Sequence, residues 1–176
     1  MDFEDLMALS RDSYVSQFAG FIETQKGLFD KGAAEVKFQL SDHSGLYRQF
    51  YCADFATGDA GGQIVELTPD EEVSFDPVSV SLGELEMTVQ RLSWHDVTLT
   101  VEDAVPPPEA FAEWFETWFD PDEVNKDWDS MYSSRVHSLL LDGHDIHVDF
   151  GTAPVEALVE LFVLLEEAGV KAATVS

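Results

Sequence analysis

The sequence predicts a single α+β domain with a largely antiparallel sheet, against which N-terminal, central and C-terminal helices pack. Its 176 residues suit one domain, because domains most often contain about 100–200 residues. Hydrophobic residues make up 45% and aromatic residues 12% of the chain, which is enough to build a core. Helical and alternating patterns follow one another in the order α, several β, α, ββ, α, β. That order is typical of an α+β domain, here over residues 1–176.

The first part of the chain predicts helix and then three strands. Apolar residues recur at nearly helical spacing over residues 3–25, as one helix or as two short helices that break near residues 10–13. Apolar and polar residues alternate over 36–40, which predicts a strand with one solvated face. Two more strands are expected at 46–55 and 63–68, separated by the glycine-rich turn TGDAGG.

The middle of the chain predicts further strands and then an acidic helix. After a charged loop at 69–77, alternation continues over 78–101. Residues 84–92 would also suit a helix, since Glu, Leu and Met favour helices, but we favour a strand. Pro108 is compatible with the first turn of a helix, and an acidic loop with aromatic residues follows at 120–134. The expected apolar stripe of that helix is Phe111, Trp114, Phe115 and Trp118.

The last third of the chain has the clearest pattern, a hairpin followed by a helix and a strand. Two apolar-rich runs at 136–141 and 145–150 flank the turn Asp-Gly-His and predict the hairpin. Thr152, or a neighbour, is expected to cap a helix that carries Pro154 in its first turn. Residues 171–175 then predict a short strand.

Charge and composition argue against several classes of function. The chain has 35 Asp and Glu against 9 Lys and Arg, for a formal net charge of −26. Such a charge repels nucleic acid and anionic lipid, so neither a nucleic acid nor a membrane is an expected partner. The single Cys52 cannot form an internal disulfide or a cysteine-based zinc site, which indicates a reducing compartment. An acidic N-terminus and short apolar runs predict a soluble, cytoplasmic protein.

The negative charge is unevenly distributed along the chain. Residues 49–125 contain eighteen acidic residues and one basic residue, Arg91, and residues 136–170 contain seven acidic residues and no basic one. Self-repulsion of this size costs folding stability, so we expect that the charge has a use in binding a partner. Solubility or a halophilic background is the alternative.

One strand of the predicted hairpin carries the best candidates for a metal or acid–base site. Asp145, His147 and Asp149 would share one face of that strand. Since the face offers neither a second histidine nor a cysteine, we interpret it as solvated and expect that a chelator leaves the melting temperature unchanged. No recognisable catalytic set or phosphate-binding loop is present, and Cys52 reads as a core thiol. The sequence therefore predicts no enzyme, no catalytic residues, no metal and no cofactor.

The acidic helix–loop segment, residues 109–129, is the candidate surface for a protein partner. Phe119 and Trp128 fall off the apolar stripe of the helix, so we interpret them as exposed anchors among charged residues. The charged loop at 69–77 is the second candidate for the partner-binding surface. The predicted partner-binding residues are Glu113, Glu116, Asp120, Asp122, Glu123, Asp127, Trp128 and Asp129.

Residues 105–176 resemble small bacterial immunity proteins, which neutralise secreted polymorphic toxins. The matching features are the hairpin that ends in Asp149-Phe150-Gly151, the helix start Ala153-Pro154, the closing Ala168-Gly169 and the tryptophan-bearing acidic helix before them. The resemblance implies a cytoplasmic protein that binds one cognate toxin tightly and performs no chemistry. It carries over no interface residue.

The net charge agrees with the class that the resemblance implies. A toxin that acts on nucleic acid or nucleotides needs a basic cleft, and an acidic inhibitor is attracted to the same surface. Electrostatic steering raises association rates by roughly 10–1,000-fold, so we expect fast, salt-sensitive binding. The alternative is a phage or plasmid DNA mimic that inhibits a restriction or defence protein.

Overall fold

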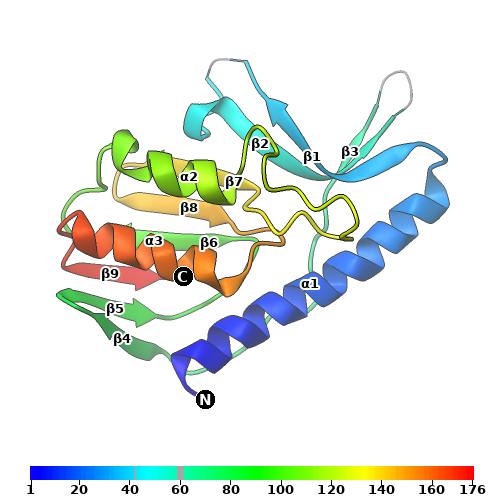
Figure 1. Cartoon of the computed structure of the whole chain (residues 1–176). Helices are drawn as coiled ribbons and strands as arrows, with labels where there is room; N and C mark the ends of the chain where they lie inside the picture. The colour runs from blue at the N-terminus through cyan, green and yellow to red at the C-terminus, as the bar shows by residue number, and fades with distance from the viewer. Residues whose placement is uncertain (42, 59–61) are drawn as a thin grey trace.

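Two sheets and three α-helices form the fold in the computed structural model, which describes residues 1–41, 43–58 and 62–176 (Figure 1). Across the larger sheet the strands are β4 (Val78–Leu82), β5 (Leu85–Val89), β9 (Ala172–Val175), β6 (Val97–Val101), β8 (Asp145–Asp149) and β7 (Ser138–Asp142). Neighbouring strands are antiparallel except β5 and β9, which are parallel. The smaller, antiparallel sheet consists of β1 (Gly32–Gln39), β2 (Phe50–Thr57) and β3 (Ile64–Val65). The α+β prediction is confirmed, with two sheets where one was expected.

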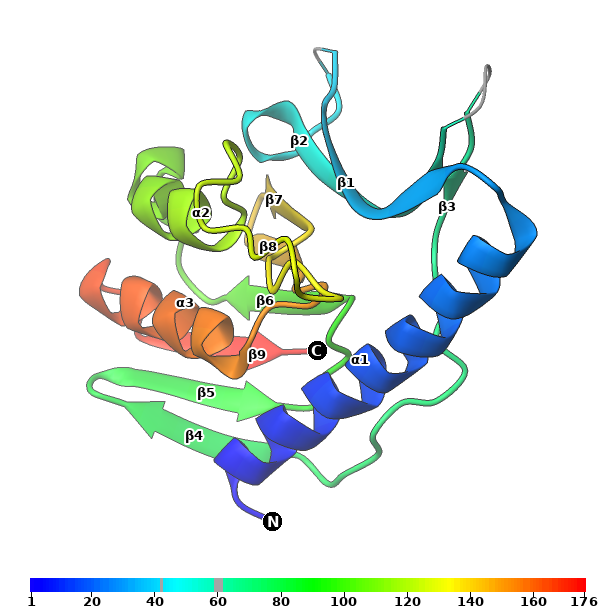
Figure 2. The ribbon, with the colours of Figure 1, turned by 45° about the vertical axis from the view of Figure 1, so that its right-hand side comes forward.

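The helices are α1 (Phe3–Leu28), α2 (Ala112–Trp118) and α3 (Val155–Glu167). Helices α2 and α3 lie side by side over one face of the larger sheet, and α1 extends from the β4 side of that sheet to the smaller sheet (Figure 1, Figure 2). The side chain of Asp2 accepts a hydrogen bond from the Asp5 backbone and caps α1, which continues as one helix. No helix in the described part of the chain is long and apolar enough to cross a membrane.

Several predicted boundaries move in the structure. The strand expected at 46–55 begins only at Phe50, because residues Tyr47–Gln49 form a 3₁₀ turn (η1) with positive φ at Arg48 and Gln49. The strand expected at 63–68 is only two residues long, and the turn before it lies partly outside the described residues. The preference for strand over helix at 84–92 is confirmed by β5.

The two predicted helix starts also differ from the structure. A 3₁₀ turn (η2, Pro108–Phe111) precedes α2, so the expected helix begins as a tighter coil. Pro154 occupies the N-cap position of α3 and provides no side-chain cap. The cap expected from Thr152 is therefore wrong, since its buried hydroxyl donates to the Glu35 carboxylate instead.

The core lies between the larger sheet and the helices α2 and α3, and it continues to buried residues of α1 and β2. Its centre is aromatic: the ring centroids of Trp94 and Phe150 are 4.9 Å apart, and Phe115 stacks on Phe119 at 4.7 Å. Cys52 is buried, as expected for a core thiol. The aromatic packing of α2 leaves the opposite face of that helix at the surface.

Candidate functional site

The apolar stripe of η2 and α2 faces the core, as its spacing predicts. Phe111, Trp114 and Phe115 are buried, and the indole of Trp114 donates to the carbonyl of Ala157 at 2.9 Å. The half-buried Trp118 donates to the Glu160 carboxylate at 2.7 Å. On the other side of the helix, Glu113, Glu116 and Thr117 are exposed.

The loop after α2 combines exposed acidic and exposed apolar side chains. Val124, Trp128 and Met131 are 79%, 76% and 56% exposed, although large hydrophobic residues usually lie inside. Three exposed aspartates lie along the same segment, at Asp122, Asp127 and Asp129. The segment has no helix or strand of its own, so its side chains are not committed to a sheet or a helix bundle.

Two residues of the predicted partner surface are not at the surface. Phe119 is fully buried, stacked on Phe115 and 5.4 Å from the ring of Phe50, so its assignment as an exposed anchor is wrong. Asp120 is 3% exposed and accepts hydrogen bonds from the backbone of Val124 and Asn125 at 2.9 Å each. Because its carboxylate holds the turn after α2, Asp120 is removed from the set of partner-binding candidates.

Basic residues already occupy part of the acidic surface. The Glu116 carboxylate pairs with Arg48, and Glu123 pairs with Lys126 at 3.0 Å. The ammonium of Lys126 also lies 4.1 Å from the ring centroid of Trp128. Among the salt bridges of the described residues, none involves the other carboxylates of the candidate set. These carboxylates belong to Glu113, Asp122, Asp127 and Asp129.

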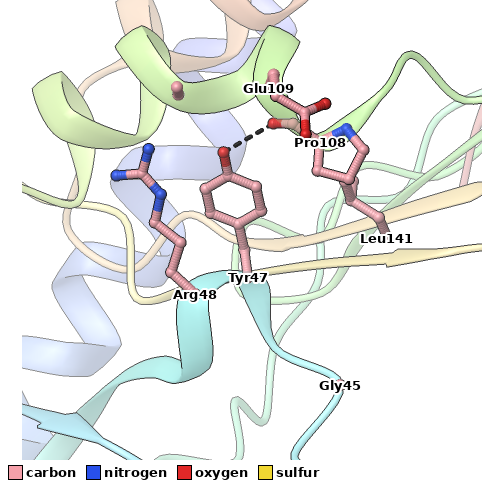
Figure 3. Close-up of a pocket in the computed structure, with 7 residues that line it drawn as sticks. Gly45, Tyr47, Arg48, Pro108, Glu109 and Leu141 are labelled. Carbon is pink, nitrogen blue, oxygen red and sulfur yellow. Dashed lines mark hydrogen bonds between the residues drawn. The ribbon is translucent and has the colours of Figure 1, made fainter.

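Two concave surfaces lie near the acidic helix–loop segment. A groove of about 450 Å³ runs between β1 and the loop, where Asp122 and Glu123 line it. A cavity of about 500 Å³ lies beside η1 and η2, where the Tyr47 hydroxyl donates to the carbonyl of Pro108 at 2.7 Å (Figure 3). Of the charged residues, only Arg48 and Glu109 line that cavity, which provides no catalytic pair from the described residues.

The three residues of the strand face, Asp145, His147 and Asp149, contact different partners in the structure. Asp145 accepts a hydrogen bond from the Thr100 hydroxyl at 2.6 Å, and the ring of His147 contacts the Thr98 hydroxyl at 3.0 Å. Both residues are partly exposed, in keeping with a solvated face. Asp149 is also partly exposed, and its carboxylate lies within 4.8 Å of side-chain atoms of the buried residues Asp54 and His137.

His137 is the centre of a buried polar cluster. Its Nε2 lies 2.8 Å from the Glu35 carboxylate and its Nδ1 lies 3.1 Å from the Asp54 carboxylate, while the ring itself has no exposed surface. The Glu35 carboxylate is held further by the backbone and hydroxyl of Ser133, each at 2.7 Å, and by the hydroxyl of Thr152. Such a network satisfies buried polar groups that would otherwise be costly.

The backbone brings the cluster together from distant parts of the chain. The amide of Cys52 on β2 donates to the carbonyl of His137, and the amide of His137 donates to the carbonyl of Asp149 at the end of β8, both at 2.8 Å. Asp54 follows Cys52 on the same strand. Gly151 has a φ of +51°, and a side chain there would overlap the His137 ring. The smaller sheet and the hairpin are thus joined at His137.

Burial and mutual charge shift the titration of this cluster. Burial disfavours a charge on His137, but the neighbouring thiol and carboxylates raise its pKa well above the ordinary value. Burial also raises the pKa of the Cys52 thiol. Burial, reinforced by the nearby Asp54 charge, raises the pKa of Asp149 to about 7.

The cluster could not be read from a motif. Glu35, Asp54 and His137 are separated by many residues and come from β1, β2 and the segment before β7. In the sequence, each of these residues is only a polar residue within a β-like apolar run. Such residues are common in proteins and indicate no chemistry by themselves. Glu35 in addition has a positive φ of 51°, which nothing in its sequence neighbourhood indicates.

Comparisons of the chain with protein-family models, curated proteins and solved structures found no match. The function must therefore be argued from the acidic helix–loop segment, the buried cluster and the net charge.

Proposed function

We propose that this chain is a cytoplasmic immunity protein that binds a basic toxin through its acidic helix–loop segment. The observation that carries the proposal is the exposure of Val124, Trp128 and Met131 among the aspartates of one loop. Exposed apolar side chains rimmed by polar residues mark interaction sites more often than plain solvated surface. The acidic rim selects a partner of positive charge.

The two kinds of side chain contribute to different stages of binding. Carboxylates at the rim accelerate encounter with a basic partner and make the association rate sensitive to salt. Trp128 is a suitable anchor, because tryptophan is enriched among the residues that dominate binding energy. Its contact with Lys126 is exposed and weak, so a partner can replace it at little cost. The groove beside β1 adjoins the same segment, and Lys37 and Lys126 line it together with Asp122 and Glu123.

The apolar component favours a toxin inhibitor over a DNA mimic. A mimic of the phosphate backbone would present a strip of carboxylates, whereas this loop alternates them with Val124, Trp128 and Met131. A toxin that acts on nucleic acid or nucleotides offers the basic cleft that such a surface would block. The chain then needs no chemistry of its own.

The proposal is tested by co-expressing the chain with the product of each flanking gene in a bacterial host. We expect that one product is toxic alone, that the chain restores growth, and that the two proteins elute together on size exclusion. The association rate of that pair should fall steeply between low and high salt. No toxic partner, or an association rate independent of salt, would contradict the proposal.

A charge-reversal variant locates the surface on the same complex. The triple change Asp122→Lys, Asp127→Lys and Asp129→Lys should weaken binding at least about 100-fold, because like charges would meet across the interface. The matched control changes net charge equally at exposed carboxylates elsewhere, namely Glu102→Lys, Asp103→Lys and Asp142→Lys. Equal losses in both variants would show that only net charge matters. Unchanged affinity in a folded triple variant would move the interface, and the loop at 69–77 would be tested next.

A further inference from the structure

We propose that Asp54, His137 and Asp149 bind one divalent metal ion of the zinc class. These residues come from β2, from the segment before β7 and from the end of β8, and one ligand atom of each lies within 4.8 Å of the others. Asp145 and His147 share the strand face of Asp149 but are not part of this site, because each contacts a threonine hydroxyl.

The hydrogen bonds of His137 leave a place for a cation. A neutral imidazole carries one N–H donor and one lone-pair acceptor. A ring protonated on both nitrogens donates to Glu35 from Nε2 at 2.8 Å and to Asp54 from Nδ1 at 3.1 Å. A metal ion bound to Nδ1 and to Asp54 would take the place of the Nδ1 proton. Glu35 then accepts the Nε2–H and orients the imidazole, a role that carboxylates, backbone carbonyls or water have for metal-bound histidines.

The charges around the site also favour a cation. Glu35 and Asp54 form salt bridges with His137, and no lysine or arginine pairs with either carboxylate in the part of the chain that the structure describes. Asp149 adds a third carboxylate, held by a hydrogen bond from the Gly151 backbone at 2.8 Å. A divalent ion bound by neutral His137 would offset most of this buried negative charge.

The distances suit a metal ion after a small contraction. Two ligand atoms on one zinc ion lie about 3–4 Å apart when each is about 2.0–2.2 Å from the metal. The Nδ1 of His137 and the carboxylate of Asp54 already have that spacing, at 3.1 Å. Asp149 needs to move by less than about 1 Å, given the ligand spacing that zinc requires. A nitrogen ligand with two carboxylates suits Zn²⁺ better than Mg²⁺.

Asp149 is the one of the three ligands that is partly exposed, whereas Asp54 and His137 are buried. Asp149 lies at the edge of a surface depression of about 250 Å³, which Asp96 and His147 also line. Glu35, Ser133 and Thr152 form a hydrogen-bonded network on the Nε2 side of His137. An ion would therefore reach the site past Asp149.

Calorimetric titration of chelator-treated, purified protein with Zn²⁺ tests the proposal, and needs no partner. We expect one equivalent to bind and the melting temperature to rise by about 5–10 °C at a free concentration of about 100 times the Kd. Mg²⁺ at the same concentration should have little effect. Failure of Zn²⁺ to bind would overturn the metal site and leave the proposed function untouched.

Two variants locate the ion. Asp149→Asn should lower Zn²⁺ affinity at least tenfold, because it replaces a charged ligand by an amide of the same size. The control Asp145→Asn with His147→Gln removes the neighbouring metal-ligating groups and should leave affinity within twofold. Equal affinity in Asp149→Asn, or loss in the control, would overturn the assignment.

A spectroscopic measurement on the unchanged chain keeps the test independent of variant folding. Nitrogen-15 NMR of His137 should show a protonated Nε2 and a metal-bound Nδ1 once Zn²⁺ is added. A ring that keeps protons on both nitrogens in saturating Zn²⁺ would mean that His137 only bridges Glu35 and Asp54, which overturns the proposal.

Discussion

Replacement of Phe119 by alanine distinguishes a core residue from an interface anchor. The ring is fully buried, stacks on Phe115 with centroids 4.7 Å apart, and contacts Phe50 across the gap to the smaller sheet. A buried Phe→Ala change costs about 3–5 kcal/mol, from lost transfer energy and from the cavity that remains. Because a domain is stable by only about 5–15 kcal/mol, the variant should unfold at a clearly lower urea concentration.

The matched change is Trp128→Ala, nine residues further along the chain. Trp128 is 76% exposed, and the ammonium of Lys126 makes a cation–π contact with its ring. An exposed contact of this kind is worth about 0.5–1 kcal/mol. Urea unfolding followed by fluorescence and circular dichroism should therefore show a shift of about 1 kcal/mol or less. If Phe119→Ala lost no more stability than Trp128→Ala, the placement of Phe119 in the core would be refuted.

Three further predictions concern the turn after α2, the buried cluster and the half-buried His95. Asp120→Ala should lower the free energy of unfolding by about 1–3 kcal/mol in urea, because two backbone amides lose their acceptor. Gly151→Ala should lower Tm more than Gly143→Ala does: both residues have positive φ, but only at Gly151 would the new side chain overlap His137. NMR titration should place the pKa of His95 below the ordinary value of 6.5, since burial disfavours its charged form. The unfolded chain then takes up that proton first, so this histidine should reduce stability as pH falls below about 6.5.

Local patterns predicted most elements, and the differences arise where distant residues decide. The stripe from Phe111 to Trp118 indicated which side of α2 is buried, since helical spacing alone determines it. Phe119 was wrongly predicted to be exposed because it packs against Phe50 of the smaller sheet. Phe50 is far from the helix in sequence, so the local pattern around the helix cannot show this contact. Thr152 likewise looks like a helix cap in its own neighbourhood, yet Glu35 lies against it in the fold.

Of the two candidate sites, one could be predicted from local sequence and the other could not. The exposed aspartates of the loop could be predicted, because a dense run of acidic residues has few ways to be buried. The cluster around His137 could not be predicted, since it depends on the pairing of β1 with β2 and on the backbone contacts of the hairpin. The sequence pattern grouped Asp149 with Asp145 and His147 as a candidate metal or acid–base site. In the structure, the ligand atoms near Asp149 belong to Asp54 and His137 instead.

The position of β9 has a consequence for how the protein folds during synthesis. This strand lies between β5 and β6, which have no ladder with each other, so the larger sheet is in two separate parts until residues 172–175 insert. A ribosome delivers those residues only after β4, β5, β6, β7 and β8 have emerged. The emerging chain must therefore keep two strand edges open and unpaired, and such edges are prone to aggregation. A chain that carries a strong excess of negative charge would repel its own copies during that interval.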